Sequence, residues 1–125
     1  MGRGLRAESG QALTEFALVL PLLVLFVVAA VQAGITLSHY QRLTDAVRAG
    51  ARAASVEHTS DAALQAIDDA SGDLQLDGTP SVQPSDNWSP GSDVTVSAKA
   101  PYSIELFGFT VISGDLTSST VQRVE

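Results

Sequence analysis

The chain contains no cysteine, few basic residues and few aromatic residues, and these shortages exclude several classes of function. Without cysteine there are no disulfides, no thiolate metal ligands and no thiol nucleophile. Seven lysines and arginines stand against 14 aspartates and glutamates, which argues against a nucleic-acid partner because phosphate binding needs clustered basic side chains. No serine lies in a Gly-x-Ser-x-Gly elbow and there is no phosphate-binding loop. The sequence therefore predicts neither an enzyme nor a cofactor site.

Charge is also missing from one long stretch near the start of the chain. Residues 16–31 carry no charged side chain. With their flanks they predict a membrane-spanning helix over residues 11–37, since about 20 apolar residues cross a bilayer. Residues 1–10 are polar and carry two arginines, as in the basic start of a signal segment. The run is longer than a usual signal core and favours a retained anchor, although small residues at 29–30 and 33–34 leave signal-peptidase cleavage open.

The predicted helix does not stop at the end of the apolar run. Pro21 lies inside the span, where it removes one backbone hydrogen bond and can kink the helix. Residues 38–57 continue with apolar side chains at helical spacing and no helix breaker, so we expect one helix from about residue 11 to residue 56. Arginines lie on both sides of the span and orient it weakly. The acidic remainder resembles an exported domain, which favours a single-pass protein with a cytoplasmic N-terminus.

Residues 58–125 predict a small α+β head. Thr59 or Ser60 is expected to cap a short second helix that ends near Ser71 and Gly72. Strands are expected at three places, residues 81–83, 93–100 and 116–124. Two or three antiparallel strands would then pack on the long helix.

The segment between the last two predicted strands is harder to assign. Pro101 is expected to end the strand before it. Residues 102–112 are conspicuously apolar and are expected to form a loop or a short helical turn that covers the edge of the sheet. Gly114 and Asp115 are expected to form a turn. This apolar patch and Trp88 either cover the sheet, the favoured interpretation, or form a surface for a partner.

Glu15 is the one carboxylate inside the N-terminal edge of the apolar stretch, and Gly10 lies five residues before it. An ionised side chain at this depth is costly unless it is paired. Two interpretations remain open. Glu15 either lies among the lipid headgroups, where it stabilises the helix dipole, or it makes a specific contact with another group.

Two sets of residues in this part of the chain carry a resemblance to a known family. The first set, at the head of the apolar run, is Gly10, Gln11, Glu15 and Phe16. The second set follows the pattern T-x-A-x-R-x-G-A-R-x-A and consists of Thr44, Ala46, Arg48, Gly50, Ala51, Arg52 and Ala54. With Pro21 in the long apolar helix, the stretch resembles a prepilin-type signal peptide and, more closely, the TadE-like family of pseudopilins.

The resemblance implies a minor pilin or pseudopilin that takes part in assembling a tight-adherence (Flp-type, type IVb-like) pilus. An inner-membrane prepilin peptidase would cut between Gly10 and Gln11, and the new amine would meet Glu15 of a neighbouring helix. Glu15 and Pro21 would then be helix-assembly contacts. The implied partners are this peptidase, the major pilin and other pseudopilins, the pilus assembly platform and the lipid bilayer.

The implied location is the bacterial inner membrane, with residues 58–125 outside the cytoplasm, or the pilus itself. One other function stays open, that of an unprocessed, single-pass membrane-anchored binding or scaffold protein of the cell envelope. Such a protein would keep residues 1–10.

Other patterns have plainer interpretations. Small residues recur every four positions at Ala46, Gly50 and Ala54, which permits close helix approach, and packing inside the chain is favoured over packing between chains. The acidic cluster in this part of the chain lacks the ligand spacing of a calcium loop, so it predicts a solvated face. It consists of Asp68, Asp69, Asp73 and Asp77. His39 and His58 are isolated in sequence, so no metal site is expected.

Overall fold

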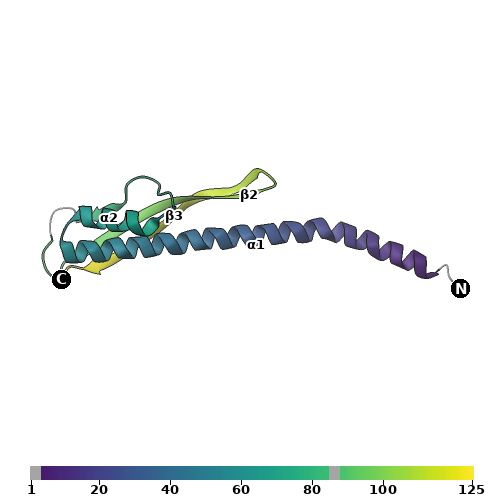
Figure 1. Ribbon diagram of the computed structural model, residues 1–125, viewed down its shortest axis with the longest axis horizontal. Coiled ribbons are helices and arrows are strands. Elements are labelled where there is room, and N and C mark those ends of the chain that lie inside the picture. The colour runs from purple at the N-terminus through teal and green to yellow at the C-terminus, as the bar shows by residue number, and fades with distance from the viewer. Residues whose placement is uncertain (1–3, 85–87) are drawn as a thin grey trace.

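The computed structural model describes residues 4–84 and 88–125 as a rod with a head along one half (Figure 1). The elements in chain order are the long helix α1 (Gly4–Glu57), the short helix α2 (Ser60–Ser71) and the strands β1 (Ser81–Gln83), β2 (Asp93–Leu106) and β3 (Phe109–Arg123). The strands form one antiparallel sheet in the order β1-β2-β3. The predicted α+β fold, with a long N-terminal helix, a short second helix and a small antiparallel sheet, is confirmed.

Helix α1 is continuous from the apolar run into the head, as the sequence predicts, and it begins at Gly4. Every side chain from Gly10 to Val27 is exposed. The helix is long and apolar enough to cross a membrane, and its apolar window is not buried in the fold. An exposed apolar surface of this size needs lipid or other helices to cover it.

Helix α1 also bends. Figure 1 shows that the helix changes direction within its N-terminal half, which contains Pro21. A proline inside a helix has no N–H to donate to the carbonyl four residues earlier, here that of Ala17. Membrane helices tolerate this loss where neighbouring groups satisfy the carbonyl.

Helix α2 begins and ends where the local signals predict. The Thr59 side chain accepts a hydrogen bond from the Ala62 N–H at 3.3 Å, which is the N-cap arrangement. Asp61 lies in the first turn, where its negative charge is favourable to the helix dipole. The helix ends before Gly72, whose φ of 56° is in the left-handed region that glycine adopts without strain.

Strand β2 does not end at Pro101, so that prediction was wrong. The Lys99 carbonyl accepts a hydrogen bond from the Asp77 N–H at 2.8 Å, on the side of β2 that faces away from β3. Residues two apart in a strand point their backbone groups to the same side, so the missing N–H of Pro101 falls on that side too. The proline therefore removes no hydrogen bond between β2 and β3, and the strand continues past it.

Residues 102–112 are not a loop or a helical turn, and Gly114 and Asp115 are not a turn. Strands β2 and β3 form one long hairpin closed at Phe107 and Gly108. Their φ values of 53° and 82° are those of a two-residue type I′ turn. A bulky residue in the left-handed region costs about 1–2 kcal/mol.

Gly114 has a different role from the predicted one. It pairs with Tyr102 across the hairpin. A Cβ atom at Gly114 would lie 3.1 Å from Cε1 of the Tyr102 ring. The glycine therefore makes room for an aromatic ring within the sheet, and no change of chain direction is needed there.

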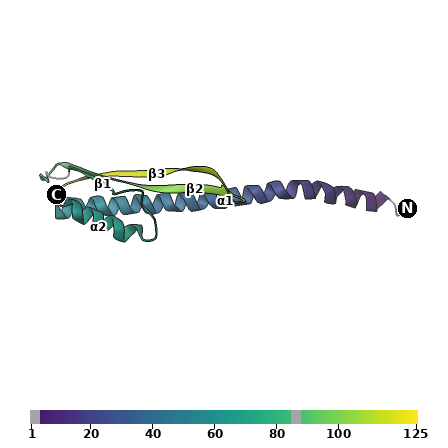
Figure 2. The ribbon, with the colours of Figure 1, turned by 90° about the horizontal axis from the view of Figure 1, so that it is seen from above.

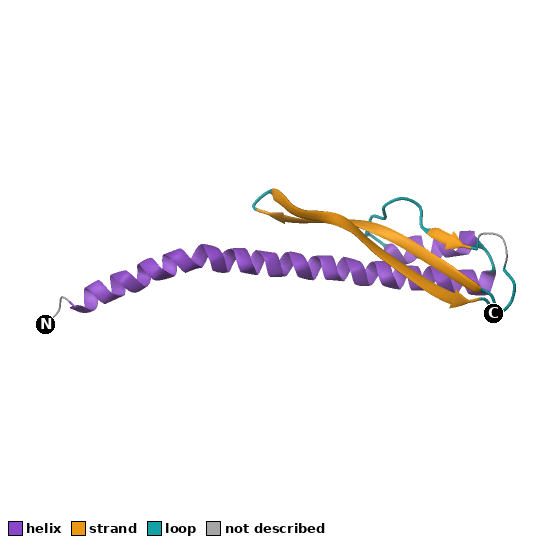
Figure 3. Ribbon diagram, turned by 180° about the vertical axis from the view of Figure 1, so that it is seen from behind, coloured by secondary structure: helices purple, strands orange, loops and turns teal. Residues whose placement is uncertain are grey.

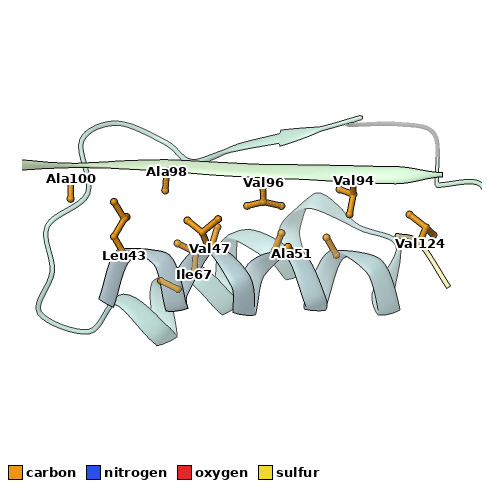
Figure 4. Packing of buried hydrophobic residues seen from close by; sticks show 12 residues of the cluster. Leu43, Val47, Ala51, Ile67, Val94, Val96, Ala98, Ala100 and Val124 are labelled. Atoms are coloured by element: carbon orange, nitrogen blue, oxygen red, sulfur yellow. The ribbon is translucent and has the colours of Figure 1, made fainter. Parts of the chain in front are cut away.

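The core lies between α1, α2 and the sheet (Figure 4). Figure 2 shows the sheet and α2 on different sides of α1, and Figure 3 shows the two long strands running along the helix. Alternate residues of β2 point at α1, as the sequence pattern predicts. The buried residues are Leu43, Ala46, Val47, Ala51 and Ala54 of α1, Ala63 and Ile67 of α2, Val94, Val96, Ala98 and Ala100 of β2, and Val124. Trp88 is half-buried against this cluster, as predicted for a cover.

Candidate functional site

The segment from Gly10 to Phe16 lies inside α1 and is fully exposed. The Gln11 side-chain amide donates a hydrogen bond to Oε1 of Glu15 at 3.1 Å. One position earlier, the Thr14 hydroxyl donates to the Gly10 carbonyl at 2.9 Å. Helical spacing therefore brings Gln11 and Glu15 together on one face, one turn apart.

Glu15 is electrostatically isolated along the helix. It is the only Asp, Glu, Lys or Arg side chain between Gly10 and Gln41. The Gln11 amide supplies one donor but no positive charge, and residues 10–41 contain no lysine or arginine that could pair with the carboxylate. In a membrane such a group is costly until a cation from another molecule meets it. Pro21 lies six positions further on and so does not share the face of Glu15.

The fold does not require a glycine at position 10. No atom lies within 4 Å of a Cβ built on Gly10, and its φ is not in the left-handed region. A glycine inside a helix costs about 1 kcal/mol relative to alanine. Neither packing nor backbone geometry therefore explains the glycine at position 10.

The second set of matching residues builds the head. Ala46, Gly50, Ala51 and Ala54 are buried, so the stripe of small residues packs inside the chain, as favoured from the sequence. A Cβ on Gly50 would lie 2.5 Å from Cγ1 of Ile67 and 3.0 Å from the Ala63 carbonyl oxygen. Gly50 is therefore the point at which α2 makes its close approach to α1.

The remaining three residues of that set are polar. Thr44 is half-buried and links α1 to β3, since its Oγ1 accepts a hydrogen bond from the buried Ser118 hydroxyl at 3.3 Å. Arg48 and Arg52 are exposed, and Arg48 forms an ion pair with Asp45 at 3.6 Å, as the helical spacing predicts. An exposed pair of this kind contributes about 0.3–0.5 kcal/mol at most.

The acidic and histidine side chains of the described residues do not gather into a metal site. Among these residues no group of three His, Asp or Glu side chains could hold a metal ion. Asp68, Asp69, Asp73 and Asp77 are all exposed, and none of them forms a salt bridge with another described residue.

The hairpin turn at Phe107 and Gly108 is not predicted from the sequence, although the apolar character of residues 102–112 is. Phe107 and Phe109 are exposed at the tip, and the Gln32 amide of α1 donates to the Glu105 carbonyl at 3.2 Å. The sequence feature that marks this turn is the dipeptide Phe107-Gly108, which lies between two apolar runs. Asparagine or aspartate is the usual first residue of such a turn, and the phenylalanine obscured the pattern.

Comparison with known proteins yields one match. No curated protein and no solved structure matches the chain. The model of the family described as "TadE-like protein" matches residues 10–52, which begin at Gly10 and include Glu15 and most of the small-residue stripe. The resemblance seen in the sequence is thereby confirmed over residues 10–52, where the chain is similar to the TadE-like proteins.

Proposed function

We propose that this protein is a minor pilin or pseudopilin that takes part in assembling a tight-adherence pilus. The observation that carries the proposal is the placement of Gly10 and Glu15 at the start of an exposed helix long enough to cross a membrane. In this proposal α1 anchors the protein in the bacterial inner membrane, with the N-terminus in the cytoplasm and the head outside. The major pilin, other pseudopilins and the assembly platform are its partners.

The proposal includes cleavage of the Gly10–Gln11 bond by a prepilin peptidase. In the folded chain this bond lies inside α1, close to its N-terminal end. The helix has to unwind locally for the bond to be cut, and ends of helices open at low cost. Cleavage removes the carbonyl to which the Thr14 hydroxyl donates and converts the Gln11 N–H into a charged amine.

The new amine supplies the positive charge that Glu15 lacks. In a bundle of such helices, the Gln11 amine of one chain and Glu15 of the next would be desolvated together, which costs far less than desolvating either alone. The pair also fixes the register of two helices whose other contacts are apolar and nonspecific. Gln11 already contacts Glu15 within its own chain, so the carboxylate lies at the correct end of the helix for this exchange.

The test is expression of the full chain with and without a prepilin peptidase, followed by intact mass and N-terminal sequencing. We expect a chain that begins at Gln11 only when the active peptidase is present. A chain that keeps residues 1–10 in its native host would overturn the processing step. It would favour the second candidate, an unprocessed membrane-anchored binding or scaffold protein, to which the unbroken course of α1 through Gly10 lends support.

Replacing Glu15 by alanine is expected to leave membrane insertion intact and to abolish assembly with other pilins. Removing one member of a desolvated charge pair costs about 3–5 kcal/mol for each contact. The apolar side chains around Glu15 cannot compensate for the lost attraction. The measurement is carbonate extraction for insertion, together with piliation counts by electron microscopy. Glu15→Gln keeps the shape and hydrogen-bonding capacity but not the charge, so it is expected to fail as well. Normal piliation in both variants contradicts the pairing role.

A further inference from the structure

The tip of the β2–β3 hairpin exposes large apolar side chains. Phe107 is 70% exposed and Phe109 is 76% exposed. Val111 and Ile112 are also exposed, and residues 106–114 include no charged side chain. The head is otherwise acidic and Ser/Thr-rich, so this apolar tip differs from the rest of its surface.

The tip lies over the middle of α1, near the point where the uncharged run ends (Figure 1). Strand β2 runs from the C-terminal end of the rod back along α1 (Figure 1 and Figure 3). It reaches Gln32, whose amide donates to the Glu105 carbonyl at 3.2 Å. Val28 and Ala29, one turn before Gln32, are half-buried, whereas residues 10–27 are exposed. Partial cover of α1 therefore begins inside the uncharged run of residues 16–31.

The dimensions of a bilayer place the tip at its surface. A helix needs about 20 residues to cross the hydrocarbon core, so a span that starts near Gln11 ends near Val31. Gln32 is the first polar side chain after this run. Strand residues rise about 3.3 Å each, so Phe107, two residues beyond Glu105, lies about 7 Å further toward the bilayer.

The turn itself carries an aromatic residue against its local preference. Phe107 adopts a φ of 53°, a conformation in which asparagine or glycine is the unstrained choice. Such departures from local preference are expected at functional positions. An aromatic side chain that is strained and also exposed to solvent gains nothing from the fold, but it gains free energy when it enters an apolar phase.

We propose that the hairpin tip, residues 106–112, is a second membrane contact, with Phe107 and Phe109 inserted in the lipid leaflet on the side of the head. The inference rests on the anchoring of α1 proposed above. Insertion stays at the headgroup boundary, because the open edges of a hairpin would leave backbone groups unpaired in hydrocarbon. The second contact limits the tilt of α1, and of the head packed on it, relative to the membrane.

Depth-dependent quenching of tryptophan tests this proposal in the full chain. Trp88 is the single tryptophan, so Trp88→Phe provides a silent background. The Phe109→Trp substitution is then added to the Trp88→Phe protein. This variant is reconstituted in phosphatidylcholine vesicles with either brominated or ordinary acyl chains. We expect the brominated lipid to remove most of the emission. The matched control is Val121→Trp, which is also exposed on β3 but lies about 40 Å further along the strand, and its emission should not change.

A third variant separates this proposal from the anchoring on which it depends. Phe26→Trp lies in the exposed apolar part of α1 and should be quenched strongly. If Phe26→Trp is quenched and Phe109→Trp is not, the second membrane contact is wrong and the anchoring of α1 is retained. If neither variant is quenched, the anchoring of α1 is wrong as well. If the Phe109→Trp emission depends on the protein-to-lipid ratio and not on bromine, the tip docks on a second copy, and the proposal is wrong.

Discussion

Replacing Gly10 by alanine is expected to abolish removal of residues 1–10 while the protein still folds and inserts. A Cβ at this position meets no atom within 4 Å, so the fold does not oppose the change. Alanine also stabilises the helix by about 1 kcal/mol, which makes local unwinding at the scissile bond harder. Intact mass after expression with the peptidase is the measurement, and the full-length mass should persist.

Gly34→Ala is the matched control for this prediction. Gly34 lies in the same helix and is also open around its Cβ position. The substitution therefore makes the same gain in helix propensity without touching the cleavage site, and processing should proceed as in the unmodified chain. Processing of Gly10→Ala at the normal rate would mean that Gly10 is not part of a recognition sequence.

Replacing Gly50 by valine is expected to destabilise the head by about 2–3 kcal/mol. Even the first added carbon would lie 2.5 Å from Cγ1 of Ile67 and 3.0 Å from the Ala63 carbonyl oxygen. The Ala63 oxygen belongs to the backbone of α2, so the clash cannot be relieved by a change of rotamer alone. Helix α2 has to move away from α1, which opens the core around Ile67.

Urea unfolding of the full chain in detergent micelles measures this effect. The emission of Trp88, which packs on the core, reports the unfolding of the head. Gly34→Val introduces the same side chain into α1 at an open position, and a change of less than about 0.5 kcal/mol is expected there. Equal stability of the two variants would show that the close approach of α2 at Gly50 contributes little.

The helices could be predicted because their signals are local. The cap at Thr59 and the glycine at Gly72 define α2 through hydrogen bonds and backbone preferences that act within one turn. The apolar run and the stripe that follows it define α1 by periodicity alone. Burial of the small-residue stripe was also correctly favoured, because the sequence supplies strands and a second helix to cover it.

The hairpin could not be predicted because its decisive contacts are distant in sequence. Pro101 breaks a strand only if its missing donor faces the neighbouring strand, and that side is set by the contact of Lys99 with Asp77. Gly114 resembles a turn residue until Tyr102 is placed opposite it. The sequence pattern shows which residue types are present but not which side of a strand they face.

The candidate site divides in the same way. The placement of Gly10 and Glu15 on an exposed helix follows from spacing and hydropathy, so the sequence was sufficient for it. The sequence marks residues 102–112 as unusually apolar and favours a cover for the sheet, which is wrong, because these residues form the hairpin and its tip is exposed. Its exposure follows from the length of the hairpin, which carries Phe107 beyond the core as far as Gln32.

The position of Pro101 has a consequence for how further chains can join the sheet. Strand β1 pairs with β2 only opposite residues 95–97, so in the described part of the chain no strand covers this edge of β2 from Pro101 onward, although the Gln32 amide of α1 donates to the Glu105 carbonyl there. A strand added along this edge would find no donor at the proline, and edges of this kind resist strand addition. The outer edge of β3 has no such interruption over its 15 residues. The outer edge of β3 is therefore the better suited of the two sheet edges to pair with an added strand.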